Sequence, residues 1–406
     1  MANSKKNITS VLLENLYFII LSFFSFFGYI FIPSYSKQSI AIIFLSLLMI
    51  VVFKIKIIKV PKNLKWYVLY MLLSILSIAY SISFQDSLNY ILLLIGLFIF
   101  QIALNNIKNS NFENISKIIC SFAFIHVIAT ILQLIFPSFI QNINKLILSE
   151  SGYLYNVSLY KYGCFAGICS DHGANAIFIS IFLVFLSANL MKEKKIKTIF
   201  LFLIGLIALL LTGKRGYLLA VIAAFVVTFI TFKNNKKNNV IKKVIFLSIL
   251  IFVIILILKY IPATSFVIDR FFDLSRDGNL LNGREDMYKI LINNIKENWV
   301  LGTGVNSTMV INLGNNGHNA FLQVFSELGI IGIFSFVGLI ISNLIYAFKH
   351  KNTNNIYSIF YQIFFICIAF TGNPMHYIPT MIMYFFMISK IYLGGKENEN
   401  SNINIS

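Results

Sequence analysis

The chain has 406 residues, of which 58% are hydrophobic and only 12% charged, and its mean hydropathy is +0.80. Soluble domains carry about a quarter charged residues, so this composition excludes a soluble globular protein and indicates an integral membrane protein. The formal net charge of +18 comes from lysines spread over short loops between apolar stretches. That distribution fits anionic lipid headgroups and argues against nucleic acid as a partner.

Apolar stretches long enough to cross a bilayer recur along the whole chain. A spanning helix needs roughly 20 apolar residues, and by that measure we expect an all-α, polytopic fold of about twelve spans. The predicted spans are 11–32, 38–53, 66–84, 87–104, 117–136, 173–191, 197–212, 216–232, 243–261, 328–347, 355–371 and 377–393. The sequence has no visible repeat of fixed period and no soluble domain, so we expect a single transmembrane domain over residues 1–406.

The basic residues divide between the loops by type. Lysines fill every second loop, and cytoplasmic loops of membrane proteins collect cationic residues, so we expect both termini, with the polar tail 394–406, in the cytoplasm. All four arginines fall on the opposite, extracytoplasmic side: Arg215, Arg270, Arg276 and Arg284. A guanidinium grips phosphate through two hydrogen bonds and cannot lose its proton. The arginines therefore predict an outer-face site for a phosphorylated, membrane-borne ligand.

Two extracytoplasmic connections are long, 136–172 and 262–318, and long loops within compact proteins are usually functional. The second contains Glu285 and Asp286, acids suited to the first turn of a helix. Residues at helical spacing then mark one face: Met287, Ile290, Leu291, Asn294 and Ile295. The pattern predicts a helix within this loop that ends near Trp299.

Lys214 and Arg215 lie side by side in a turn between two spans, on the extracytoplasmic side. Two adjacent cations could partly neutralise a diphosphate. The alternative is a turn at the membrane interface whose basic side chains reach up to lipid headgroups.

Arg284 stands at the start of the predicted loop helix. A cation there faces the positive end of the helix dipole, which is unfavourable unless an anion joins it. Backbone N–H groups at the same end would bind a phosphate alongside the guanidinium. An ion pair with Glu285 or Asp286 is the alternative.

His318 and Asn319 close the large loop and open a short helical segment that breaks at Gly329. On that helix one face is polar and consists of Asn319, Gln323, Ser326 and Glu327. A polar stripe beside the membrane usually lines a wet cavity or a helix contact. The imidazole of His318 could accept a proton from a sugar hydroxyl, although a hydrogen-bonded structural histidine would fit equally.

Other clusters of polar residues predict no further chemistry. Asp269, Asp273 and Asp277 alternate with arginines, which favours solvated ion pairs, and no His/Cys set has metal-ligand spacing. We therefore expect neither a metal nor a cofactor. The run 169–172 contains Ser, Asp and His, but adjacent residues rarely build a catalytic triad. His376 receives no role.

Three segments together resemble the O-antigen ligase/polymerase family of integral membrane glycosyltransferases. They are Leu211-Thr212-Gly213-Lys214-Arg215-Gly216, then Gly283-Arg284 with the following helix and its Gly302 and Gly304, and finally 318–329. The third segment has an HN pair followed by an LQ pair, a glutamate and a glycine. The similarity covers roughly residues 160–345.

The resemblance implies a twelve-span fold with a large extracytoplasmic loop between spans nine and ten, in a bacterial cytoplasmic membrane. It implies transfer of a glycan from undecaprenyl diphosphate to an acceptor sugar hydroxyl, without metal. Arg215 and Arg284 would then act on the diphosphate and His318 on the acceptor hydroxyl. Lys214 stands where relatives often carry a small residue. The remaining substrate-binding residues would be Asn319, Gln323 and Glu327.

The same resemblance leaves the reaction partner open. A polymerase uses another lipid-linked repeat unit as acceptor, whereas a ligase uses lipid A-core; we favour a polymerase of O-antigen or capsular polysaccharide. A chain-length regulator and a flippase are the protein partners it implies. The chain could instead be a transporter of lipid-linked oligosaccharide, but transporters usually show internal repeats and broken helices near mid-membrane.

Overall fold

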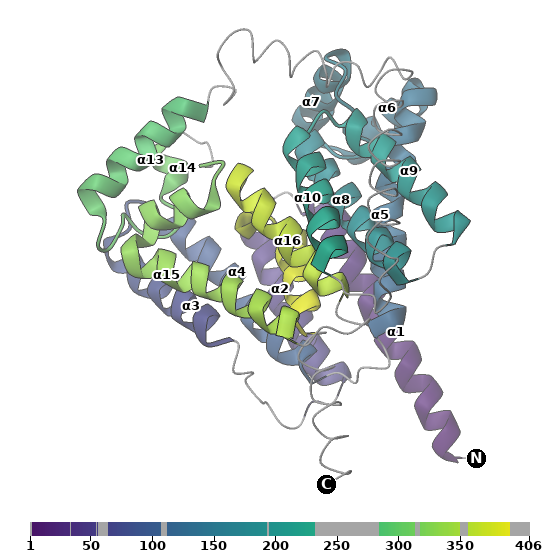
Figure 1. Cartoon of the computed structure of the whole chain (residues 1–406), viewed down its shortest axis with the longest axis horizontal. Helices are drawn as coiled ribbons and strands as arrows, with labels where there is room; N and C mark the ends of the chain where they lie inside the picture. Colours follow the sequence, from purple (N-terminus) through teal and green to yellow (C-terminus); the bar gives the residue numbers. More distant parts are fainter. Residues whose placement is uncertain are drawn as a thin grey trace. The chain divides into compact units, whose positions relative to one another are not determined.

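The computed structural model of this chain is helical (Figure 1). It describes residues 2–32, 34–53, 55, 64–106, 112–192, 195–231, 284–312, 317–349 and 356–389. Within these ranges, six helices are long and apolar enough to cross a membrane, and several shorter apolar helices accompany them. The protein is a polytopic membrane protein.

The helices follow one another along the chain with short connections. Those before the large loop are α1 (Ala2–Phe31), α2 (Tyr35–Val52), α3 (Lys65–Ser77), η2 (Ile78–Tyr80), α4 (Phe84–Leu104), α5 (Phe112–Ile135), α6 (Pro137–Ile147), α7 (Glu150–Lys161), α8 (His172–Lys192), α9 (Ile196–Leu211) and α10 (Arg215–Thr231). The later ones are α13 (Arg284–Asn298), α14 (Thr308–Ile311), α15 (Ala320–Lys349), α16 (Ile356–Thr371), η4 (Pro374–His376) and an apolar helix over Ile378–Ser389.

Every predicted span except 243–261 coincides with one of these helices. That span lies outside the described residues, as do Arg270, Arg276, the three aspartates beside them and the tail 394–406. The span count of twelve and the orientation in the membrane stay predictions.

The two long connections are partly helical. The first, expected only as a loop, contains α6 and α7; Pro137 begins α6, and the Ser149 hydroxyl caps α7 by accepting the Gly152 N–H at 3.2 Å. The helix expected in the second connection is confirmed as α13. One position on its face was wrong, because Ile290 is 40% exposed.

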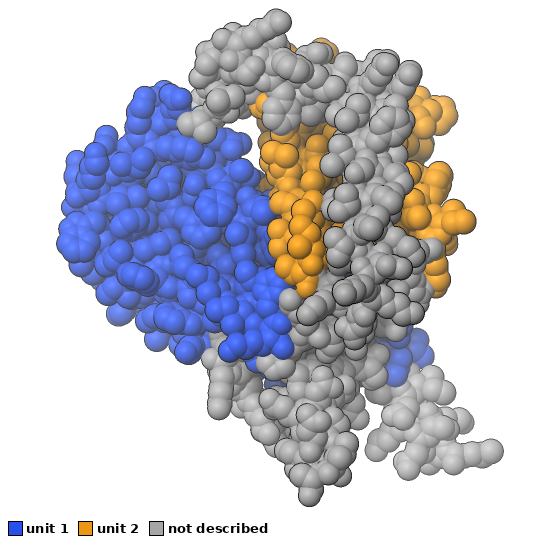
Figure 2. Space-filling view, in the orientation of Figure 1, with its two compact units in different colours: residues 1–119, 283–406 blue, residues 120–282 orange. Residues whose placement is uncertain are grey.

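The chain divides into two compact units, coloured separately in Figure 2. One is formed by Met1–Ile119 with Gly283–Ser406, and the other by Cys120–Asn282. We call them unit 1 and unit 2. Whether they act as the single transmembrane domain expected from the sequence stays a prediction.

In unit 1, α2 packs along α4, and α3 packs along α15. A β-carbon on Gly96 of α4 would lie 2.9 Å from the Ile42 side chain of α2, so only glycine allows this approach. The Ser46 hydroxyl of α2 also donates to the Gly96 carbonyl at 3.1 Å. Small residues and interhelical hydrogen bonds are the usual means of holding helices together in a membrane.

Helix α15 is interrupted at Gly329, which has φ 64° and ψ −161°, as the sequence predicted. The loop after α13 satisfies the backbone groups that this break frees. The Gly304 N–H donates to the Glu327 carbonyl at 2.9 Å, and the Ile330 N–H donates to the Trp299 carbonyl at 2.9 Å. Freed backbone groups in a membrane protein need such partners because lipid offers none.

In unit 2, α8 is the central helix, since 83% of its apolar window is buried and both α9 and α10 pack against it. The loop before α8 lies on the α9–α10 turn, where the Phe165 N–H donates to the Leu211 carbonyl at 2.9 Å. Buried amides hold this loop from beneath: the Asn156 amide donates to the Cys169 carbonyl at 2.6 Å.

Candidate functional site

Arg284 is the first residue of α13 and is half-buried. Its guanidinium donates to the carbonyl oxygen of Thr371, the last residue of α16, at 3.0 Å. No carboxylate among the described residues pairs with it, and Asp286 instead meets Lys289 at 3.5 Å. A guanidinium has five N–H donors, so most of those on Arg284 are available to an anionic ligand.

Helix α13 joins Arg284 to the segment that holds His318. Tyr288 lies one turn after Arg284, on the same face of the helix, and its hydroxyl donates to the His318 carbonyl at 3.3 Å. Leu291, one further turn along, is fully buried, and its side chain packs against Gly317. One face of α13 therefore carries the cation and contacts the histidine segment.

His318 is half-buried and has φ 49°, a left-handed conformation that residues other than glycine rarely adopt. Such a conformation costs about 1–3 kcal/mol and persists only where the surroundings hold it, which is common at functional sites. Asn319 follows it and caps α15: its side-chain oxygen accepts the N–H groups of Phe321 and Leu322 at 3.0 and 3.1 Å. This cap fixes the end of the strained turn.

Gln323 and Glu327 lie one turn apart on α15, are 1% exposed, and have partners inside the protein. The Gln323 amide nitrogen donates to Glu327 Oε1 at 2.8 Å and to His376 Nε2 at 3.2 Å. The Gln323 oxygen accepts the Gly317 N–H at 3.1 Å. Their predicted contact with substrate stays a prediction, but their geometry connects them to the backbone beside His318.

His376, to which the sequence assigned no role, completes this group. It ends the short helix η4, and its ring stacks on Tyr90 with centroids 4.5 Å apart. Neighbouring atoms surround the ring although part of its surface stays accessible, and this desolvation lowers the pKa of His376 to about 4. The ring is therefore neutral at pH 7. A histidine between two apolar helices, next to Pro374, was the only signal in the sequence.

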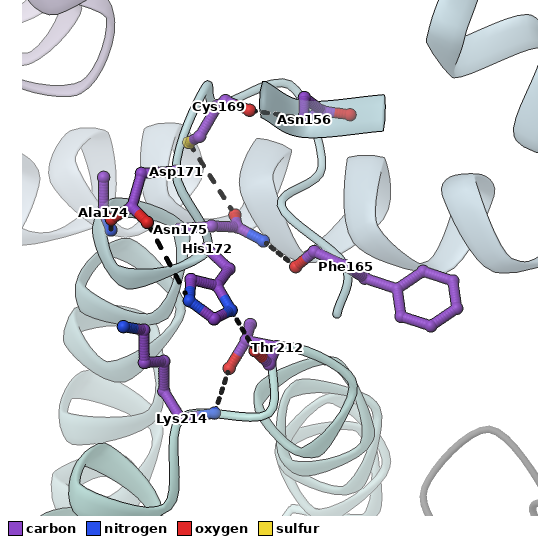
Figure 3. Close-up of polar contacts among 9 residues, drawn as sticks. All are labelled: Asn156, Phe165, Cys169, Asp171, His172, Ala174, Asn175, Thr212 and Lys214. Carbon is purple, nitrogen blue, oxygen red and sulfur yellow. Dashed lines mark hydrogen bonds and ion pairs between the residues drawn. The ribbon is translucent and has the colours of Figure 1, made fainter. Parts of the chain in front are cut away.

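In unit 2, Lys214 and Arg215 lie where α10 begins, after a turn in which Gly213 has φ 70° (Figure 3). His172 Nδ1 donates to the Thr212 carbonyl of this turn at 3.0 Å, and its Nε2 lies 3.9 Å from Asp171. Both Lys214 and Arg215 are half-buried.

The beginning of α8 lies beside the Lys214 side chain. Asp171 caps α8 by accepting the Ala174 N–H at 3.0 Å. A β-carbon on Gly173 would lie 2.6 Å from Asp171 Oδ2 and 3.5 Å from Lys214 Nζ. The positive ends of α8 and α10 thus meet near two cations and one carboxylate, an environment suited to an anion of more than one charge.

The predicted site residues are therefore found in two groups. Unit 1 contains Arg284, His318, Asn319, Gln323 and Glu327, which α13, α15 and the 371–376 connection bring together. Unit 2 contains Lys214 and Arg215. A joint site of the two groups stays a prediction.

Among the described residues, no group of three His, Cys, Asp or Glu side chains could hold a metal ion. Residues 200–337 match the family model described as O-antigen ligase. The chain carries an O-antigen ligase family domain. The matched region contains all seven predicted site residues, whereas His172 and His376 lie outside it. No curated protein matches the chain.

The O-antigen ligase domain places the protein among the bacterial membrane glycosyltransferases that transfer lipid-linked glycans in surface polysaccharide synthesis. The family model covers ligases and polymerases alike.

Proposed function

We propose that the protein is a polymerase of O-antigen or capsular repeat units. It transfers a glycan from undecaprenyl diphosphate to a sugar hydroxyl of a second lipid-linked unit, on the outer face of the cytoplasmic membrane. The observation that carries the proposal is the pairing of Arg284 and His318 through one face of α13, within the family domain. Arg284 has donors to spare for phosphate, and His318 is held in a strained turn.

The proposed reaction is a single displacement. The acceptor oxygen forms a bond to the anomeric carbon while the bond from that carbon to the diphosphate oxygen breaks. His318 takes the acceptor proton, and the electron pair leaves with the lipid diphosphate. Arg284 and Arg215, assisted by Lys214, stabilise the charge that develops on the leaving group. The mechanism inverts the anomeric configuration and uses no metal, and Asn319 shapes the turn that presents His318.

A ligase is the second candidate, because the matched family is described by that activity. The two functions differ in acceptor, so purified protein in lipid vesicles should be given a lipid-diphosphate repeat unit alone. Multimers of the repeat support the polymerase; turnover only after addition of lipid A-core supports the ligase. Labelled lipid that crosses the bilayer with no new glycosidic bond would instead indicate a transporter.

Single variants test the assigned residues in the same assay. Arg215→Ala, Arg284→Ala and His318→Ala should each abolish long-chain glycan while the protein remains in the membrane. Normal chain-length ladders from all three variants would overturn the assignment.

A further inference from the structure

Gln323 uses every hydrogen-bonding group of its side chain inside unit 1. Its oxygen must face the Gly317 N–H, because a backbone N–H can only donate. Its nitrogen then carries the two hydrogens that point to Glu327 Oε1 and to His376 Nε2. The orientation of the amide is thus fixed by its neighbours rather than by convention.

This orientation also fixes the form of His376. Since Gln323 donates to Nε2, that nitrogen must present a lone pair, and the ring proton must lie on Nδ1. A proton on Nε2 would place two donors against each other. The stack on Tyr90 holds the ring plane, so the acceptor points at Gln323.

We propose that His376 is a positioning residue for His318, acting through the Gln323 side chain and the Gly317 N–H. The inference rests on the proposed function, in which His318 takes the acceptor proton. It adds a residue from outside the matched family domain.

The chain of contacts is short and reaches the strained residue directly. Gly317 immediately precedes His318, whose φ of 49° must be held by its surroundings. Gln323 holds the backbone before His318, Tyr288 holds its carbonyl, and the Asn319 cap holds the backbone after it. Without the His376 acceptor, one Gln323 N–H is left buried without a partner, and the amide can rotate away from Gly317.

The experiment compares two replacements of His376. Phe keeps the ring and its stack on Tyr90 but removes the acceptor; Gln can place an oxygen where Nε2 lies. We expect His376→Phe to lower the rate of glycan transfer about 10- to 100-fold, chiefly in kcat, because misplacement of a reacting group slows chemistry more than binding. His376→Gln should recover most of that loss. Gln323→Leu should match His376→Phe, and the double variant should be no slower than either, because both break one chain of contacts.

A second measurement keeps the inference separate from the proposed function. Hydrogen exchange is followed in the peptide that contains Gly317 and His318, in the full-length protein in detergent. His376→Phe should speed exchange at the Gly317 amide, and His376→Gln should restore protection. Tyr288→Phe, which removes a different contact of the same turn, should leave the Gly317 amide protected.

The outcomes divide clearly. If His318→Ala transfers glycan as fast as the unaltered protein, the proposed function fails, and the exchange result alone decides whether His376 holds the turn. If His318→Ala is inactive while His376→Phe and His376→Gln are equally slow, or neither is slowed, the acceptor is irrelevant and the inference is overturned. Unchanged exchange in His376→Phe also overturns it.

Discussion

The Arg284 guanidinium donates to the Thr371 carbonyl at 3.0 Å, so the first residue of α13 is tied to the last residue of α16. The same connection, a few residues later, carries His376, which contacts Gln323 of α15. A cation near the end of a helix stabilises its unsatisfied carbonyls. The contact therefore aims Arg284 while leaving other N–H donors for a ligand.

Arg284→Lys should lower glycan transfer about 100-fold although the charge is retained. An ammonium on a flexible stem cannot bond the Thr371 carbonyl and grip phosphate with two parallel donors at once. The rate of transfer from a lipid-diphosphate donor measures the effect. Lys289→Ala is the matched control, because it removes an exposed cation of the same helix and should change the rate less than about twofold. Equal losses in both variants would show that α13 needs only positive charge.

Gly302→Ala should destabilise the protein by at least about 3 kcal/mol, because φ is 73° and the new β-carbon would lie 2.3 Å from the Glu327 carbonyl group. Thermal unfolding in detergent measures it. At Gly372 the nearest atom to a new β-carbon is the Ile368 carbonyl oxygen at 3.4 Å, so Gly372→Ala should cost about 1 kcal/mol or less. Similar melting temperatures for the two variants would contradict the close approach at the α15 break.

His172→Phe should lower the melting temperature more than His172→Asn does. Phe leaves the buried Thr212 carbonyl without the donor it now has, at a cost of about 1–3 kcal/mol, whereas the Asn amide can replace Nδ1. The Phe variant should also transfer glycan more slowly, because the turn that carries Lys214 and Arg215 is loosened. No difference between the variants would mean that the ring only fills space.

Acid should destabilise the protein through His376. Its pKa in the folded chain is about 4, below the ordinary value of 6.5, so the unfolded chain binds more protons between these values. The contribution of the neutral ring is complete above pH 6.5 and is lost as pH falls toward 4. His376 faces Gln323 and Tyr90, with Glu327 beyond the amide. Melting temperatures of His376→Phe should fall less over this interval than those of the unaltered protein. Parallel curves would contradict the assignment.

The product should have the inverted anomeric configuration, and EDTA should leave the rate unchanged. A single displacement inverts the carbon, and guanidinium groups supply the stabilisation that a metal ion gives elsewhere. Nuclear magnetic resonance of the product linkage checks the first expectation, and the transfer assay checks the second. Retained configuration would require a covalent intermediate and another set of roles.

The sequence by itself determined the membrane spans and the loop helix, because both follow from local patterns. A run of apolar residues must become a helix in lipid, which offers no partner for backbone groups. The acids after Gly283 and the helical spacing up to Trp299 predicted α13 with almost its observed ends. The break at Gly329 was also local, since a glycine between two helical segments is where the chain can turn.

Only the tertiary structure decided what the polar side chains contact. The partner of Arg284 is a carbonyl oxygen 87 positions away in the chain, and that of Gln323 is a histidine 53 positions away. Sequence spacing shows which residues share a helix face, but not which distant loop folds back onto that face. Hydrogen bonds depend on positions within a few tenths of an ångström, and packing between helices sets those positions. That is why His376 looked idle in the sequence and yet contacts Gln323 in the folded chain.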